Sequence, residues 1–135
     1  MASIGVPREI KADEQRVALT PDAVRELVSH GLEVRIQSGA GDGAGIADDA
    51  FAAAGAEVVT CEQAWGAHLV VKVKEPQPEE FRFLRKDMVL FTYLHLAAYP
   101  QVGEALLEAG TASVSYTHLR AHETRHDLVC RLLLE

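Results

Sequence analysis

Short apolar runs alternate along the chain with segments whose apolar residues recur at helical spacing. The apolar runs predict strands at Ser3–Val6, Glu33–Gln37, Glu57–Val59, Leu69–Val73 and Met88–Leu94, and a sixth strand from about Thr111. The intervening segments predict helices from Pro21 to Gly31, from Asp48 to Gly55, over Cys61–Ala67, over about Glu79–Arg85, and from Pro100 to Gly110. Strands separated by helices imply βαβ crossovers and a parallel sheet.

Several residues support these boundaries. Thr20 offers a hydroxyl N-cap, and Pro21 fits the first position of a helix. We expect Asp48 to cap the second helix and Trp65 to anchor the third. Leu69–Val73 is apolar on both faces, as in the centre of a parallel sheet. The predicted fold class is therefore α/β, a Rossmann-like or flavodoxin-like parallel sheet with helices on both faces, here as a partial domain.

Composition narrows the functional classes. The 135 residues are enough for one domain, with 48% apolar and 24% charged residues. The net charge of −7 argues against a nucleic-acid partner. No membrane span is expected, because Lys72 and Lys74 interrupt the most apolar stretch. Cys61 and Cys130 cannot form a disulfide framework, so a reducing cytoplasm is the default.

The glycine-rich segment Ser38–Gly45, SGAGDGAG, follows a strand and precedes a helix. Glycines in this place let a backbone approach a pyrophosphate. Neither Gly39 nor Gly41 starts a full G-x-G-x-x-G, however, and the strand is the second one. We therefore interpret the segment as a connection packed closely against neighbouring backbone.

Three segments place polar side chains after predicted strands, where parallel sheets carry their sites. Arg16 lies in a charged loop after the first strand, and its guanidinium could fork onto a carboxylate or remain solvated. Lys72 and Lys74 end the fourth strand on one face, and one of them could bind an oxyanion. His95 ends the fifth strand and could transfer protons or be structural. Together these residues suggest a site for a small anionic keto acid, whereas His30, at a helix C-terminus, is interpreted as structural.

The strings GVPREIKADEQRVALTP, SGAG, KVKEP and LFTYLHLAA occur in this order over about Ser3–Ala112. In this respect the chain resembles the N-terminal domain of the alanine dehydrogenase and pyridine-nucleotide transhydrogenase family. KVKEP and HLAA are similar to the alanine dehydrogenase branch rather than to the transhydrogenase alpha subunit.

The resemblance implies NAD-dependent, reversible oxidative deamination of L-alanine to pyruvate and ammonia. It implies that Arg16 grips the substrate carboxylate, that Lys74 contacts the carboxylate and keto oxygen, and that His95 is catalytic. It further implies a cytoplasmic homo-hexamer in which a separate Rossmann domain binds NAD. That domain is missing from this chain, so we expect the chain alone to be inactive.

The resemblance stops near residue 112, and residues 113–135 are a different kind of sequence. His122 and His126 fit the zinc-protease pattern H-E-x-x-H, with His118 one helical turn earlier. No third ligand or substrate cleft is visible around the pattern, and we expect no metal site. VSYTHLRAHET and LVCRLLLE instead resemble an in-frame translation of a sequencing-library adapter, so we interpret the tail as non-native.

Two other functions remain open. The chain could be a fragment of a transhydrogenase alpha subunit, which moves hydride between two nucleotides. It could also be a non-catalytic domain that binds a small anion, with saturable pyruvate binding as its test.

Overall fold

The computed structural model describes residues 2–94 and 98–114. They form a six-stranded sheet of β1 (Ser3–Val6), β2 (Glu33–Gln37), β3 (Glu57–Val59), β4 (Leu69–Val71), β5 (Val89–Phe91) and β6 (Ala112–Val114). Every pairing between neighbouring strands is parallel, in the order β3-β2-β1-β4-β5-β6. This is the strand order of a Rossmann-like sheet, and it confirms the predicted fold class.

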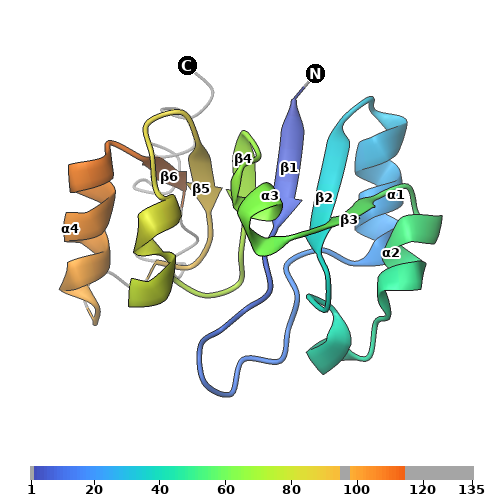
Figure 1. Ribbon diagram of the computed structural model, residues 1–135, viewed down its shortest axis with the longest axis horizontal. Coiled ribbons are helices and arrows are strands. Elements are labelled where there is room, and N and C mark those ends of the chain that lie inside the picture. The colour runs from blue at the N-terminus through green and yellow to red at the C-terminus, as the bar shows by residue number, and fades with distance from the viewer. Residues whose placement is uncertain (1, 95–97, 115–135) are drawn as a thin grey trace, which may run out of the picture.

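Helices join the strands (Figure 1): α1 (Pro21–Ser29), α2 (Asp48–Ala53), α3 (Cys61–Trp65) and α4 (Pro100–Ala109), with short 3₁₀ helices η1 (Asp42–Ala44) and η2 (Pro78–Phe83). Thr20 caps α1 by accepting a hydrogen bond from Ala23 N at 3.2 Å. Gly31 and Gly110 follow α1 and α4 in left-handed backbone conformation, as the sequence predicts. Among the described helices, none has both the length and the hydrophobicity needed to cross a bilayer.

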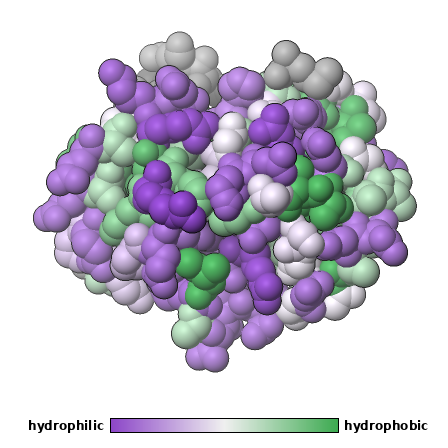
Figure 2. Space-filling model, in the orientation of Figure 1, coloured by the Kyte–Doolittle hydropathy of each residue, from purple (hydrophilic) through white to green (hydrophobic). Residues whose placement is uncertain are grey.

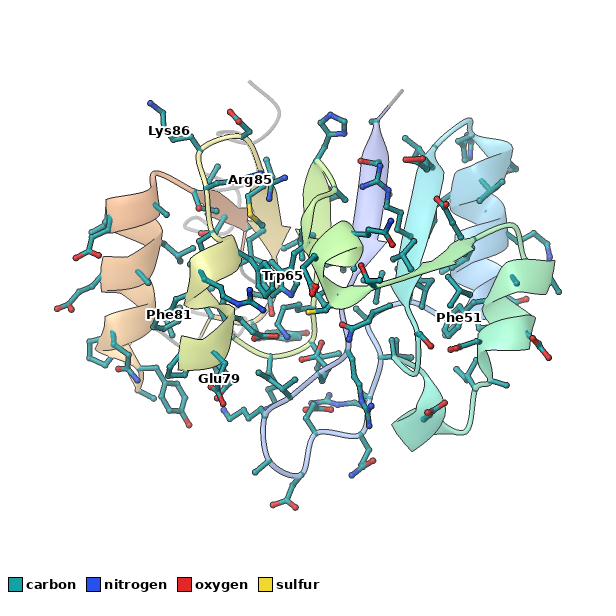
Figure 3. The ribbon with its side chains drawn as sticks, in the orientation of Figure 1. Phe51, Trp65, Glu79, Phe81, Arg85 and Lys86 are labelled. Atoms are coloured by element: carbon teal, nitrogen blue, oxygen red, sulfur yellow. The ribbon has the colours of Figure 1, made fainter. Side chains whose placement is uncertain are left out.

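Two apolar clusters hold the helices on the sheet. One surrounds Phe51 between α1, α2 and the first two strands, and the other surrounds Trp65 between α3, η2, α4 and strands β4 and β5. Both side chains lie against the sheet in Figure 3, and each is at most 1% exposed. Trp65 stacks on Phe83 with ring centroids 5.2 Å apart, so it anchors its helix as expected.

The backbone of α3 packs directly on Gly5 in β1. A Cβ at this position would overlap the carbonyl oxygen of Ala64. All four residues of β1 are buried, so both faces of this central strand are covered. The surface in Figure 2 is mainly polar, with smaller apolar patches between the charged side chains.

The structure corrects the ends of two predicted strands and the type of one predicted helix. The fourth and fifth strands end at Val71 and Phe91 rather than at Val73 and Leu94. Lys72 N still donates to the Phe91 carbonyl of β5, but the following N–H groups, of Val73 and Lys74, donate to the carboxylate of Glu9 instead of to a strand, so the fourth strand ends early. The helix predicted over 79–85 is the 3₁₀ helix η2.

The cap of α2 is also different from the prediction. Ala47 is the N-cap residue, and it provides no side-chain hydrogen bond. The carboxylate of Asp48 turns back to accept hydrogen bonds from Gly39 N and Ser38 Oγ, both at 2.9 Å. Asp48 therefore closes the glycine-rich loop and does not cap its helix.

Candidate functional site

The strand order places a crevice between β1 and β4. Connections run in opposite directions from these two adjacent strands, and open α/β sheets bind ligands at such a point, beyond the carboxyl ends of the strands. The segment 7–20 follows β1 and extends beyond this end of the sheet (Figure 1). Residues 72–77 follow β4 on the other side of the crevice. We call these segments the β1 loop and the β4 loop.

Glu9 ties the two loops together. Its carboxylate accepts hydrogen bonds from the backbone of Val73 at 2.8 Å and of Lys74 at 3.2 Å. It also accepts one from Lys72 Nζ at 3.0 Å, in a pair whose side chains are 1% and 2% exposed. On the opposite side, Thr92 Oγ1 donates to the Lys74 carbonyl at 2.8 Å. The backbone that carries Lys74 is thus held from both sides.

Lys72 and Lys74 both reach the β1 loop, as their alternation predicts, but they have different environments. Lys72 is buried between Glu9 and Glu80, whose carboxylate oxygens lie 3.0 and 3.4 Å from its ammonium. Burial raises the pKa of the Glu80 carboxyl above its ordinary value. Lys74 keeps a side chain that is 28% exposed and faces the crevice from the β4 loop. Of the two lysines, Lys74 is therefore the one available to a ligand.

A second ion pair fixes the β1 loop farther along. Lys11 Nζ donates to both carboxylate oxygens of the buried Glu75, at 2.7 and 3.0 Å, and to the Tyr99 hydroxyl at 3.3 Å. The ammonium also lies 4.4 Å from the centre of the Tyr99 ring. The hydrogen bond to Glu75 raises the pKa of Lys11, so this ammonium stays charged at neutral pH. This contact draws the loop toward the segment that precedes α4.

Arg16 lies at the outer part of the β1 loop. Its side chain is 65% exposed, but Val17, Ala18 and Leu19 pack against the Phe51 cluster and hold its backbone. Its Nε and Nη2 donate to the two carboxylate oxygens of Glu14 at 2.8 and 2.9 Å. Of the two alternatives that the sequence leaves open for Arg16, a fork onto a carboxylate and a solvated side chain, the structure combines both: the fork exists with Glu14 as its carboxylate, and the side chain is exposed.

Glu14 is the shared anion of this part of the site. Its side chain is only 5% exposed, and its Oε1 lies 4.0 Å from Lys74 Nζ. Hydrogen bonds from Arg16 lower the pKa of the Glu14 carboxyl to about 2. A tight turn aims it inward, since Glu14 N donates to Lys11 O and Asp13 has a φ of 66°. The sequence analysis did not identify Glu9 and Glu14 as site residues, although both lie in the segment that contains Arg8, Lys11 and Arg16.

A pocket of about 200 Å³ opens between the β1 loop and the glycine-rich loop. Its charged lining consists of three cations and three acids: Arg8, Lys11 and Arg16 with Glu9, Asp13 and Glu14. Such a lining suits a small polar molecule better than an apolar one.

The glycine-rich loop packs as interpreted from the sequence. A Cβ on Gly41 would lie 2.5 Å from the Ile46 carbonyl oxygen, and one on Gly43 would overlap Gln15. Asp48 already occupies the Gly39 N–H, which a phosphate would need. Because protein atoms fill the space and a carboxylate takes this donor, the loop does not fit a dinucleotide pyrophosphate.

Two groups of predicted residues remain outside this description. His95, the expected catalytic residue, lies outside the described residues, as do His118, His122, His126 and Cys130 of the tail. Within residues 2–94 and 98–114, no three His, Cys, Asp or Glu side chains gather in a way that could hold a metal ion. His30 is the C-cap of α1 and lies 3.4 Å from Glu26, which fits its structural interpretation.

The comparisons with known proteins agree with this geometry. The family model "Alanine dehydrogenase/PNT, N-terminal domain" matches residues 5–130. The chain belongs to this family. The matched range passes residue 112, where the sequence analysis sets the domain boundary, so the non-native tail stays a prediction.

Individual relatives give the same picture. Alanine dehydrogenase of Bacillus subtilis is 51% identical over 114 residues, which are 84% of this chain and 30% of that protein. The Mycolicibacterium smegmatis alanine dehydrogenase is 51% identical over 122 residues, 89% of this chain and 33% of that protein. The chain therefore spans about a third of the length of these relatives.

Two solved structures share the fold. An L-alanine dehydrogenase superposes with a TM-score of 0.83 at 50% identity, covering 84% of this chain and 32% of that one. A transhydrogenase from Sinorhizobium meliloti gives a TM-score of 0.80 at 26% identity, covering 93% of this chain and 39% of that one. The higher identity lies on the alanine dehydrogenase side.

Proposed function

We propose that this chain is the substrate-binding part of an alanine dehydrogenase, which converts L-alanine, water and NAD reversibly into pyruvate, ammonium, NADH and a proton. The observation that carries the proposal is the position of Arg16 and Lys74, which Glu14 links across the crevice between β1 and β4. Relatives named alanine dehydrogenase, about 50% identical over this region, supply the reaction.

The two cations suit a 2-keto acid. Arg16 uses Nε and Nη2 for Glu14, and among the described residues its Nη1 has no hydrogen-bond or ion-pair partner. A substrate carboxylate bound by Nη1 would lie close enough to Lys74 for the ammonium to polarise the neighbouring keto oxygen. The family resemblance assigns His95 as the catalytic histidine beside the substrate, where its imidazole would transfer protons.

The cofactor requires a different part of the protein. The glycine-rich loop, the candidate nucleotide site of the described chain, is filled by Gln15 and closed by Asp48. We therefore assign NAD to a further domain, of the kind that a longer relative would supply. A cytoplasmic homo-hexamer is part of the same proposal.

A chimaera tests the proposal. Residues 2–112 replace the matched segment of Bacillus subtilis alanine dehydrogenase, and NADH oxidation is followed with pyruvate and ammonia. We expect activity, and we expect Arg16→Gln to raise the KM for pyruvate at least tenfold. A folded chimaera without activity would contradict the proposed function. Hydride transfer between two nucleotides, with no dependence on pyruvate, would favour the transhydrogenase alternative.

A further inference from the structure

The arrangement of Arg16, Glu14 and Lys74 contains an acid where an anion-binding site would be expected to contain only cations. Glu14 is nearly buried, faces the crevice, and contacts both groups that we assign to the substrate. A carboxylate in this place repels an anionic ligand, so a site selected only for strong anion binding would not keep it. Its position therefore calls for a functional reason.

The charges of the surrounding groups show what Glu14 changes. Lys11 is paired with Glu75, and Lys72 lies between Glu9 and Glu80. Glu14 makes two hydrogen bonds to Arg16 but lies at 4.0 Å from Lys74. Among the described residues, the Arg16–Glu14 pair is thus neutral as a unit, and Lys74 adds one positive charge to it. The other charged residues that line the pocket outside these pairs, Arg8 and Asp13, carry opposite charges.

We propose that Glu14 sets the charge that this site accepts, restricting it to keto acids with a single carboxylate. This inference rests on the proposed function of Arg16 and Lys74. One excess positive charge matches one carboxylate, while a second negative charge on the ligand would face Glu14 without compensation. The guanidinium keeps its Nη1 for hydrogen bonding, so Glu14 removes net charge without removing the donor that recognises the carboxylate.

Two small anions of nearly equal shape but different charge can show whether the site selects its ligand by charge or by size. Oxamate carries one negative charge and oxalate carries two, and both are planar and about as large as pyruvate. The 135-residue chain is titrated with each anion at pH 7.5 and fixed ionic strength, by calorimetry or by changes in amide chemical shifts. We expect the wild type to bind oxamate more tightly. We expect Glu14→Gln to shift the ratio of the two dissociation constants about tenfold toward oxalate.

Two further variants define the role of the charge. Glu14→Asp keeps the negative charge and is expected to keep the preference for oxamate. Asp49→Asn removes the same charge from an exposed position of α2 outside the pocket lining, and is expected to shift the ratio less than threefold. A shift of equal size in Asp49→Asn would overturn the assignment to Glu14, since it would show a general effect of net charge.

The outcomes separate this inference from the proposed function. A ratio that stays unchanged in Glu14→Gln, or equal weakening of both anions, overturns the charge-setting role while oxamate binding still depends on Arg16. Oxamate binding that survives Arg16→Gln, or absent binding to the wild type, contradicts both proposals. If Glu14→Gln alone does not fold, Glu14→Ala is titrated in its place, with the same expected shift of the ratio toward oxalate. An unchanged ratio in that variant would overturn the inference.

Discussion

The buried ammonium of Lys72 offers the sharpest test of how the two loops are held together. Its side chain is 1% exposed and lies between the carboxylates of Glu9 and Glu80, which are 2% and 5% exposed. Lys72→Met removes the charge and keeps an unbranched chain of similar length. The variant leaves two buried carboxylates with no cation between them, which is the costly case for a buried ion pair.

The expected loss of stability is large. Breaking a buried pair by removing one partner costs about 3–5 kcal/mol, a major part of the roughly 5–15 kcal/mol that stabilises a typical domain. The loss should depend on pH. Lys72 opposes the rise that burial causes in the pKa of Glu80, so that pKa rises further in the variant. A raised carboxyl pKa favours the folded state at low pH, so the variant should lose stability as pH rises from 5 to 7.5.

Urea unfolding at both pH values measures the effect. Trp65 is the one tryptophan of the chain, and its burial against Phe83 makes its emission a direct signal of folding. Lys86→Met, at an exposed lysine, is the control and should change the free energy of unfolding by less than about 0.5 kcal/mol. Adding Glu80→Gln to Lys72→Met should recover more than about 1 kcal/mol. A loss below about 1 kcal/mol at pH 7.5, or an equal loss at pH 5, would refute the reasoning.

Three further predictions concern single positions. Arg16→Lys should weaken oxamate binding at least tenfold in a titration. An ammonium lacks the planar set of donors that lets a guanidinium bind Glu14 and a ligand at the same time, so unchanged affinity would contradict the role of the guanidinium. Gly5→Ala should cost about 3 kcal/mol in urea unfolding, since its Cβ overlaps the Ala64 carbonyl oxygen, and a neutral result would contradict that packing. Because the folded pKa of Glu14 is about 2, below its ordinary 4.5, its charge stabilises the fold above pH 4.5, and that contribution is lost as pH falls toward 2. In urea unfolding at pH 6, the free energy of unfolding of the wild type should thus be about 1 kcal/mol larger than that of Glu14→Gln, with screening by solvent included. The difference should shrink by pH 3, and a difference that stays constant would contradict the role of the Glu14 charge.

The alternation of apolar runs was enough to predict the sheet. Each strand must bury its side chains on helices, and the capping residues Thr20, Gly31 and Gly110 mark where those helices begin and end. The lengths of β4 and β5 could not be predicted in the same way. Just after β4, Glu9, about sixty positions away in the sequence, accepts the N–H groups of Val73 and Lys74 that could have continued the strand, and no local pattern records that contact.

Within the site, residue types were predictable but pairings were not. Lys72 and Lys74 look equivalent in the sequence, and only the approach of Glu9 and Glu80 assigns one of them to the interior. The sequence offered a fork as one of two alternatives for Arg16, whereas the partner of that fork, Glu14, depends on a turn at Asp13 with positive φ. Such a turn is set by the conformation of the whole loop and not by spacing.

The strand order explains why this loop needs so many ion pairs. At the junction of β1 and β4 the connections diverge, so the carboxyl edge has no helix of its own to cover it. Val17, Ala18 and Leu19 anchor the end of the β1 loop on the Phe51 cluster, and the part of the loop over the crevice is held through Glu9, Lys11 and Glu14. Apolar packing would fill the crevice, whereas charged contacts fix the backbone and keep the space beside Arg16 and Lys74 polar. The residues that stabilise the loop and the residues that would bind a keto acid are therefore neighbours in one network, and a change in either should be measurable in the other.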